Sequence, residues 1–526
     1  MPAEAAAAAG PRDLAPKRTA LMACILSSSL VGMDGMMTPV ALPDLADDLN
    51  AGLAVQQWVV AAFLLALGSL LLVGGALGDV VDRWRIFAAG AAGFGASALV
   101  VAVAPTASLL VAGRLAQGAT AALLVPGALA VITTTFEGDE RSRAIGSWTA
   151  WSGLSVIGGP LAGGVLVDVV SWRAVYGVLV PMAALTLFFI LRATPRGARE
   201  AQAGSVDWGG ALLTVPAVGG PVFALIEGPG SGWGSRLVVG ALVAGAAAIA
   251  GLAWWEPRAC DPLLPVRLLQ VPAFMTLNAV TLVLYGALIS SGFYTVLFLQ
   301  QTAGYPPAAA GLAAAVPVVV LLVLSRRFGA LADRHGPRRF IVGGALVVAA
   351  GILLMLRTDA HADFLSVVLP SVLVHGVGLA MLVAPLTSTV LSAAPDGLTG
   401  AASGMNNAVA RIGSLLGTVA VGLVVSATFP AALDDHGLPP AVVRQAEDRP
   451  LASTPSADVP VSERARVREV LSAASVDAFH VAVGAMGGLA LLAAMIGAVG
   501  ARRPRGRFAA ARVPGGALHG AHHDLD

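Results

Sequence analysis

Two charged residues lie within long apolar stretches and are the strongest chemical signal in the sequence. Asp34 stands in the apolar stretch 20–42, and Arg114 stands in the stretch 108–132. A charged side chain inside a bilayer is costly, so it usually serves a function. A buried carboxylate beside an arginine can exchange that partner for a proton or a cationic ligand. A fixed structural Asp–Arg pair is the alternative.

Asp34 and Arg114 are predicted to lie at similar depths in a membrane. If the chain starts inside the cell, the stretch 20–42 runs outward and the stretch 108–132 runs inward. At 1.5 Å per residue, Asp34 lies about 12 Å and Arg114 about 9 Å from the outer ends of their helices. We therefore expect the two side chains to meet. Gln117 lies one turn after Arg114 and completes this predicted coupling site.

Other polar residues inside apolar stretches are candidates for lining a cavity, and a hydrogen bond between helices explains each of them equally well. They are Asn278, Tyr285, Tyr294, His375, Asn406, Asn407 and Arg411. For Arg411, placements in the cavity, beside an asparagine or at a helix interface all stay open.

The elements that must position these residues are membrane-spanning helices. Hydrophobic residues make up 57% of the 526-residue chain and charged residues 12%, against about 25% charged in soluble domains. A spanning helix needs about 20 mostly apolar residues. Fourteen stretches fit: 20–42, 57–77, 86–104, 108–132, 144–167, 174–192, 207–226, 237–255, 273–299, 308–328, 338–356, 364–390, 400–427 and 477–500.

The basic residues predict the orientation of these spans. With the N-terminus inside, 22 of the 32 Lys and Arg residues fall in inside segments and three in short outside loops. Cytoplasmic loops carry this excess, so we expect a multi-pass protein of the plasma or inner membrane with both termini cytoplasmic. The long outside loop 428–476 is polar, with a short amphipathic helix predicted around 462–471. The basic tail 501–526 is predicted to be disordered, beside anionic lipid.

Several functional classes are disfavoured by the composition. A net charge of +1 gives no basic field for nucleic acid, and Lys17, the single lysine, has no phosphate-binding context. Cys24 and Cys260 are too far apart to suggest a disulfide framework or a zinc site. We expect no cofactor, no metal and no catalytic residue.

Two sets of residues repeat along the chain. Two loops share a Gly-x-Leu-x-Asp pattern followed by arginine, at an offset of 254 residues; they contain Gly75, Asp79 and Arg83, and Gly329, Asp333, Arg334 and Arg338. An offset of 258 relates Gly118, Gly146, Gly159 and Gly164 to Gly376, Gly404, Gly417 and Gly422. The offset spans eight helices, so two six-helix halves are separated by two extra helices. Repeated halves predict a substrate site near the midplane between them.

These residues carry a family resemblance. The two Asp loops resemble the cytoplasmic signature of the major facilitator superfamily, Arg114-Leu-Ala-Gln-Gly118 resembles its intramembrane arginine motif, and Gly159-Pro-Leu-Ala-Gly-Gly164 resembles its antiporter motif. Asp34 with Ala41-Leu-Pro43 is similar to the first helix of the fourteen-span drug:proton antiporter branch, as is Asp261-Pro-Leu-Leu264 before the ninth span. The first loop departs from the pattern at Val80 and Asp82, and the first span at Met36 and Pro39.

The resemblance implies roles for these motifs. It implies an all-α major facilitator fold in which the Asp loops latch one conformation, where a plain solvated loop is the alternative. It implies a hinge at Gly159, Pro160, Gly163 and Gly164, where tight helix packing is the alternative.

The expected organisation is a leader 1–19, a six-helix half 20–192, two additional helices within 193–270, a second six-helix half 271–500 and a tail 501–526. The expected function is proton-coupled antiport of small amphipathic molecules such as drugs or antibiotics, by a monomer in contact with membrane lipid. A lipid exporter and a proton–solute symporter on the same fold are the alternatives.

Overall fold

The computed structural model describes residues 11–194, 206–259, 266–395, 397–434, 438–455 and 459–500. The side chains of residues 11–15, 79, 266, 434 and 441 are outside this description, and so are Cys260, the motif at 261–264 and the predicted tail 501–526. Within the described ranges the chain forms helices and no strand, and fourteen helical segments are long and apolar enough to cross a membrane. The predicted number of spans is confirmed.

Six spans form an N-terminal half. Its helices are α1 (Pro11–Asp48), α2 (Leu53–Val80), α3 (Arg83–Ala102), α4 (Ala107–Thr135), α5 (Gly138–Val169), and α6 (Trp172–Gly177) with α7 (Leu179–Ala193), which together make the sixth span. Hydroxyl or carboxylate side chains begin several of these helices: Asp82 accepts from the backbone N–H groups of Trp84 and Arg85, and Thr106 from that of Leu109. Such caps satisfy N–H groups that the first helical turn leaves unpaired.

Six further spans form a C-terminal half. Its helices are α11 (Pro272–Gln301), α12 (Pro307–His335), α13 (Pro337–Leu353) with η3 (Leu354–Arg357), η4 (Phe364–Val368) with α14 (Leu369–Ser392), α15 (Thr399–Asp434), α16 (Pro440–Glu447) and α17 (Arg464–Gly500). Of these, α16 lies in the connection between the last two spans and does not cross the membrane by length.

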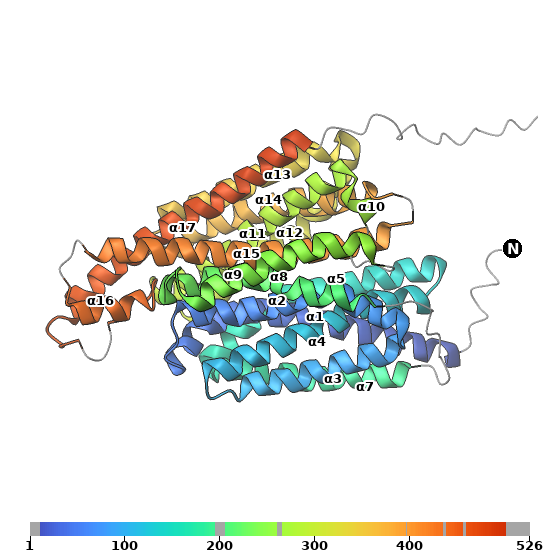
Figure 1. Ribbon diagram of the computed structural model, residues 1–526, viewed down its shortest axis with the longest axis horizontal. Coiled ribbons are helices and arrows are strands. Elements are labelled where there is room, and N and C mark those ends of the chain that lie inside the picture. Colours follow the sequence, from blue (N-terminus) through green and yellow to red (C-terminus); the bar gives the residue numbers. More distant parts are fainter. Residues whose placement is uncertain are drawn as a thin grey trace, which may run out of the picture.

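The two halves repeat one packing scheme. α1 packs against α5 as α11 packs against α15, and α2 packs against α4 as α12 packs against α14. The halves meet through α5 with α12 and through α2 with α15, which are equivalent pairs in the repeat. Figure 1 shows the blue N-terminal bundle beside the yellow-to-red C-terminal bundle, with their helices running roughly parallel to one direction.

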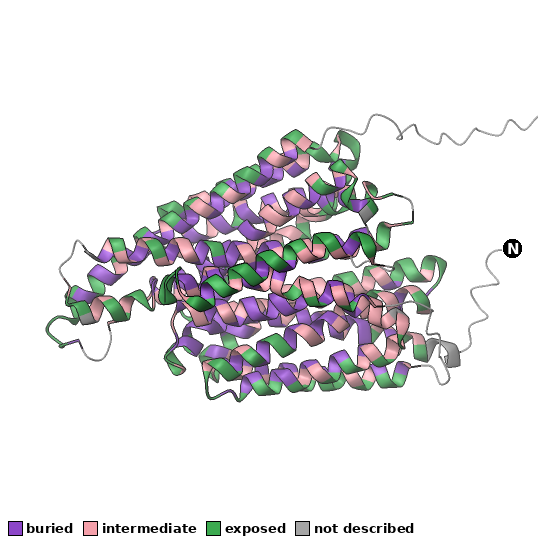
Figure 2. Cartoon of the chain, in the orientation of Figure 1, coloured by how far each residue is buried: buried purple, intermediate pink, exposed green. Residues whose placement is uncertain are grey.

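The two additional spans lie beside the junction of the halves. α8 (Trp208–Ser231) contacts both α2 and α15, and α9 (Arg236–Trp255), followed by η2 (Glu256–Arg258), packs on α8. The short helix α10 (Val266–Leu269) precedes α11. In Figure 2 the outer faces of α8 and α9 are largely green, and Leu237 is 74% and Val243 63% exposed. Exposed leucine and valine on a spanning helix suit contact with lipid.

The two ends of the bundle are named here by the connections that they carry. The α1–α2 end carries Asp48 and Leu53, and the α2–α3 end carries Val80 and Arg83. α16 projects from the α1–α2 end, on the left of Figure 1.

Two predicted boundaries differ from the structure. α1 continues six residues beyond the predicted end at 42, through Pro43 to Asp48, so it projects past its apolar stretch. The predicted loop 428–476 is much shorter, because α15 continues to Asp434 and α17 begins at Arg464. The amphipathic helix predicted around 462–471 is therefore the first part of the last spanning helix and not a separate element.

Candidate functional site

Asp34 and Arg114 form a buried ion pair between α1 and α4. Arg114 Nη1 lies 2.8 Å from both Asp34 Oδ1 and Asp34 Oδ2. The side chains are 0% and 1% exposed, so the pair lies away from solvent and from lipid. The structure thus brings together the two residues whose predicted depths matched.

Neighbouring groups fix both partners of this pair. Gln117 accepts from Arg114 Nη1 at 2.7 Å and donates to Asp34 Oδ1 at 3.3 Å. Arg114 Nε donates to the Val59 carbonyl of α2 at 2.9 Å. The rings of Phe63 and Tyr176 lie 4.5 and 5.5 Å from the guanidinium carbon, which is within the range of cation–π contact. A buried ion pair needs such additional bonds to offset its desolvation.

The Gly-Pro-x-x-Gly-Gly motif of α5 packs on the turn of α1 that carries Asp34. A Cβ added at Gly159 would lie 2.8 Å from Met36 Cβ, and one added at Gly163 would lie 3.0 Å from Met37 Cα. Side chains at these positions would force α5 away from α1. The motif therefore holds α5 directly against the Asp34 turn.

The same motif also reaches the other half. A Cβ at Gly164 would lie 2.6 Å from Ala308 Cα and 2.7 Å from the Pro307 carbonyl of α12, and the Pro160 carbonyl lies against Gly311. Gly422 is the repeat equivalent of Gly164, and it lies against Gln57 of α2. Each of these equivalent glycines thus lies against a helix of the opposite half.

Hydrogen bonds join the halves at the α1–α2 end. Gln57 Nε2 donates to Tyr294 Oη at 2.8 Å, and Tyr294 Oη donates to the Thr418 carbonyl at 2.9 Å. The other bonds between spanning helices of the two halves are from Gln300 Nε2 to the Val40 carbonyl, from Gln301 Nε2 to Gln56 Oε1 and from the Ala308 N–H to Asp168 Oδ2. Among the described residues, all hydrogen bonds between the halves lie at this end, and this set of bonds is called the seal.

The segment 438–455 ties the same end from outside the spans. Arg449 Nη1 pairs with Asp47 Oδ1 at 2.9 Å, and the Asp448 carbonyl accepts from the Leu53 N–H at 2.9 Å. The Leu451 carbonyl accepts from Thr302 Oγ1 at 2.7 Å. Leu451 itself is fully buried at a φ of 77°, a backbone region that branched side chains rarely adopt. This segment, here called the outer strap, thus binds α1, α2 and α11 together.

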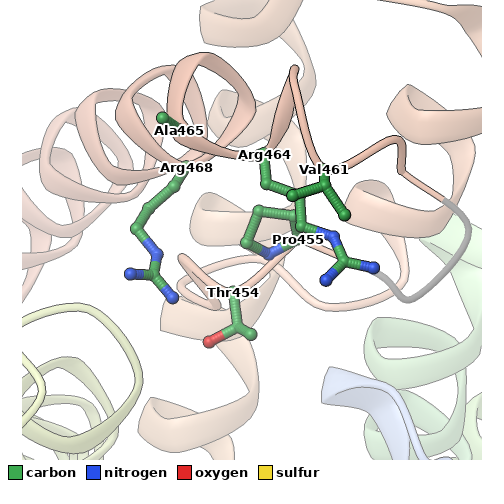
Figure 3. Close-up of a pocket in the computed structure, with 6 residues that line it drawn as sticks. All are labelled: Thr454, Pro455, Val461, Arg464, Ala465 and Arg468. Atoms are coloured by element: carbon green, nitrogen blue, oxygen red, sulfur yellow. The ribbon is translucent and has the colours of Figure 1, made fainter.

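A surface pocket of about 560 Å³ lies where the outer strap meets the start of α17. Figure 3 shows the residues that line it: Thr454, Pro455, Val461, Arg464, Ala465 and Arg468. These residues belong to the α15–α17 connection and to the first turns of α17, so the pocket is separate from the Asp34–Arg114 pair.

The two Asp loops lie at the α2–α3 end, and their predicted role as a latch stays a prediction. In the first loop Asp82 caps α3, while the side chain of Asp79 is outside the described residues and Arg83 Nη1 donates to the Ala130 carbonyl at 3.4 Å. In the second loop Asp333 and Arg334 lie in the exposed last turn of α12, and Arg338 donates to the Ala498 carbonyl of α17. Gly75 and Gly329 make no close helix contact.

Most predicted cavity residues in the C-terminal half are engaged in packing. Tyr294 belongs to the seal. Asn406 Oδ1 accepts from Thr281 Oγ1 at 3.1 Å, and Asn278 Nδ2 donates to the Phe274 carbonyl at 2.9 Å, whereas Asn278 Oδ1 is buried without a partner. His375 is buried in α14, with its backbone against Gly351 of α13.

Arg411, Tyr285 and Asn407 remain accessible. Asn407 is exposed, and Arg411 and Tyr285 are partly exposed. A Cβ added at Gly68 of α2 would lie 3.3 Å from Arg411 Cβ, so Arg411 stands at an interface between the halves. It makes no hydrogen bond with Asn406 or Asn407. The Cβ of Arg411 thus lies at the interface of α15 with α2, and its side chain is partly exposed there.

Some residues around the site escaped prediction. α8 extends to Ser231, so Glu227 lies inside a helix and accepts from Trp58 Nε1 at 2.7 Å. The signal was an acidic residue one position after the predicted span end at 226. Phe63 and Tyr176 gave no signal, because aromatic residues in apolar stretches are usually core.

A sequence profile of the Major Facilitator Superfamily matches residues 24–418. The chain belongs to the major facilitator superfamily. Among its relatives in the superfamily, the puromycin resistance protein of Streptomyces alboniger is 35% identical over 450 residues, covering 84% of this chain and 88% of that protein. The multidrug resistance protein Stp of Mycobacterium tuberculosis is 32% identical over 79% of this chain and 77% of its own length. The tetracenomycin C resistance and export protein of Streptomyces glaucescens is 29% identical over 90% of both chains.

Solved structures show the same fold. A bacterial homologue of the human lysosomal transporter Spinster aligns with a TM-score of 0.63 and 16% identity, over 94% of this chain and all of that one. The chain is therefore a membrane transporter with the major facilitator fold, extended by two central helices.

Proposed function

We propose that this transporter is a proton-coupled antiporter that exports small amphipathic molecules, with the α2–α3 end in the cytoplasm. The observation that carries the proposal is the buried Asp34–Arg114 pair. Asp34 lies on a turn of α1 that packs directly against the glycines of α5. The names of its relatives support the export of antibiotics, since they include resistance to puromycin and both resistance to and export of tetracenomycin C.

Asp34 is the proposed proton carrier. Arg114 contacts both carboxylate oxygens, and Asp34 is fully buried, which leaves room for a proton but not for a bulky cation. A proton on Asp34 removes its negative charge, so the carboxyl group no longer attracts the guanidinium of Arg114 as an ion. Arg114 then keeps its bonds to Gln117 and Val59, so the guanidinium stays partnered while α1 is released.

α5 is the proposed link between proton binding and opening. Its Gly159 and Gly163 rest on the Asp34 turn of α1, and its Gly164 and Pro160 rest on α12. A shift of α1 would therefore reach the opposite half through α5, which contacts both. Packed interfaces of this kind switch between discrete arrangements and do not deform continuously.

The sealed α1–α2 end fits one state of an alternating-access cycle. The seal of Gln57 with Tyr294, together with the outer strap, closes the end that the basic residues predict to be outside. In this state a substrate would enter from the cytoplasmic α2–α3 end, and protonation from the other side would follow only after the seal has broken.

Inverted membrane vesicles test the proposal. With the lumen acidified by respiration, the wild-type chain should accumulate an amphipathic dye, and collapsing the pH gradient with nigericin should abolish accumulation. Adding the dye should raise the luminal pH, because each exported molecule releases protons outward. Accumulation that survives the collapse would contradict the proposal.

The Asp34→Asn variant tests whether Asp34 carries the coupled proton. We expect it to lose proton movement by at least about tenfold, which corresponds to about 1.4 kcal/mol. Near-normal proton-coupled export by this variant at neutral pH would remove Asp34 from the mechanism. Dye that leaves the vesicles together with protons would indicate symport instead.

A further inference from the structure

We infer that Arg411 forms a second, separate binding site that takes the acidic oxygens of an amphipathic anion, such as a carboxylate or phenolate. The inference rests on the proposed export function and assigns a substrate class to it. It starts from a difference in pairing: Arg114 has a carboxylate partner within the membrane, whereas Arg411 forms no ion pair or hydrogen bond with a described residue.

The position of Arg411 is deep within the spans. It lies twelve residues after the start of α15 at Thr399, and its Cβ packs on Gly68 near the middle of α2. The Arg114 Nε bond reaches α2 at Val59, nine residues earlier, so Arg411 lies about 14 Å further toward the α2–α3 end, where the described residues form no hydrogen bond between the halves. A substrate that enters from that end would meet Arg411 before it meets the Asp34–Arg114 pair.

The surroundings of Arg411 supply polar and aromatic contacts. Tyr285 of α11 lies within electrostatic range of the guanidinium, and its neighbour Gly286 packs on Gly413 of α15. Asn407 lies one helical turn before Arg411 on α15 and is exposed. These three residues combine a cation, a phenolic hydroxyl, an amide and a ring, which together suit a flat acidic molecule.

Charge balance selects an anion for this place. Glu227 of the neighbouring helix α8 is bonded to Trp58, ten residues before Gly68 on α2. Asp34 is matched by Arg114. An intramembrane guanidinium without a carboxylate attracts acidic oxygens strongly, because its planar donors bind a carboxylate in pairs and the dielectric constant is low.

Matched pairs of compounds test the inference. A host lacking its own efflux pumps expresses the full chain and is grown against antibiotics supplied both as the free carboxylic acid and as the methyl ester. For each variant the ratio of protection against acid to protection against ester is measured. We expect Arg411→Gln to lower this ratio at least about tenfold and Arg411→Lys, which keeps the charge, to lower it much less.

Controls separate this inference from folding and from the export function. Arg444→Gln removes an exposed arginine of α16 and should leave the ratio unchanged. Equal loss of acid and ester protection in Arg411→Gln, with normal amounts of protein in the membrane, would overturn the acid site and indicate a structural arginine. An unchanged ratio would overturn it as well. A wild-type chain that protects against no compound would instead contradict the proposed export.

Discussion

The two halves share one arrangement of helices but differ in how their intramembrane charges are paired. In the N-terminal half Arg114 is fully buried, with a carboxylate, an amide, a carbonyl and two aromatic rings around it. In the C-terminal half Val372 stands at the position equivalent to Arg114, and Arg411 lies on another helix, partly exposed and without a carboxylate. A saturated pair suits proton exchange, whereas an open guanidinium suits a visiting ligand.

The largest effect should come from breaking the buried pair. Arg114→Gln leaves the Asp34 carboxylate buried without a countercharge, which costs about 3–5 kcal/mol. We expect little folded protein and no transport, measured by thermal unfolding in detergent and by dye accumulation in vesicles.

The double variant Asp34→Asn with Arg114→Gln is the matched control for that change. It removes both charges, so it should recover most of the lost thermal stability while remaining uncoupled. If the single and double variants were equally unstable, the ion pair would not be the cause of the loss.

The next effect tests the contact of α5 with the opposite half. Gly164→Val places a side chain where Ala308 Cα is 2.6 Å from an added Cβ, so the α1–α2 end should not close fully. Overpacking costs about 1–3 kcal/mol, and we expect export to fall roughly 30-fold. Gly158→Val, where an added Cβ meets nothing within 4 Å, should export normally. An equal loss of export in both variants would show that the contact between α5 and α12 does not determine export.

A smaller effect is expected at Gln117. Its amide bonds to both Arg114 and Asp34, and a hydrogen bond to a charged group contributes about 1.5–3 kcal/mol. Gln117→Leu should therefore slow proton-coupled export about tenfold. Thr133→Val on the same helix removes only a bond to its own backbone and should change export little. A Gln117 variant as active as wild type would show that the pair needs no third partner.

The smallest effect concerns the outer strap. The Arg449–Asp47 pair is partly solvent-exposed, at 31% and 77%, so it contributes no more than about 1 kcal/mol. Arg449→Gln should shift the population toward an open α1–α2 end by at most about fivefold. Spin labels at the exposed residues Val169 and Val461 report the opening as a longer distance. No shift relative to an Arg444→Gln control would make the strap a passive cover.

The spans, the repeat and the partner of Asp34 could be predicted from the sequence, because they depend on quantities that are local to the chain. Apolar length gives each span, and depth along two helices gives the meeting of Asp34 with Arg114. The glycine offset of 258 residues also reflects geometry, since Gly164 and Gly422 both face the opposite half.

The remaining features depend on how helices rotate and on which ends meet. Gln57 and Tyr294 are ordinary polar residues in sequence, and only the packing of α2 on α15 makes them a seal. The rotation of α15 decides which neighbouring helix Arg411 faces, and composition carries no information about that rotation. Asp82 caps α3, and the loop pattern did not predict this cap, because it depends on where α2 ends and α3 begins.

The division between a coupling half and a binding half is tested most directly in one set of inverted vesicles. Luminal pH and accumulation of an acidic substrate are recorded together for wild type, Asp34→Asn and Arg411→Gln. We predict that Asp34→Asn abolishes the pH change at every substrate concentration, whereas Arg411→Gln raises the concentration of acid needed for it. Undiminished substrate-driven proton movement in Asp34→Asn would contradict the account.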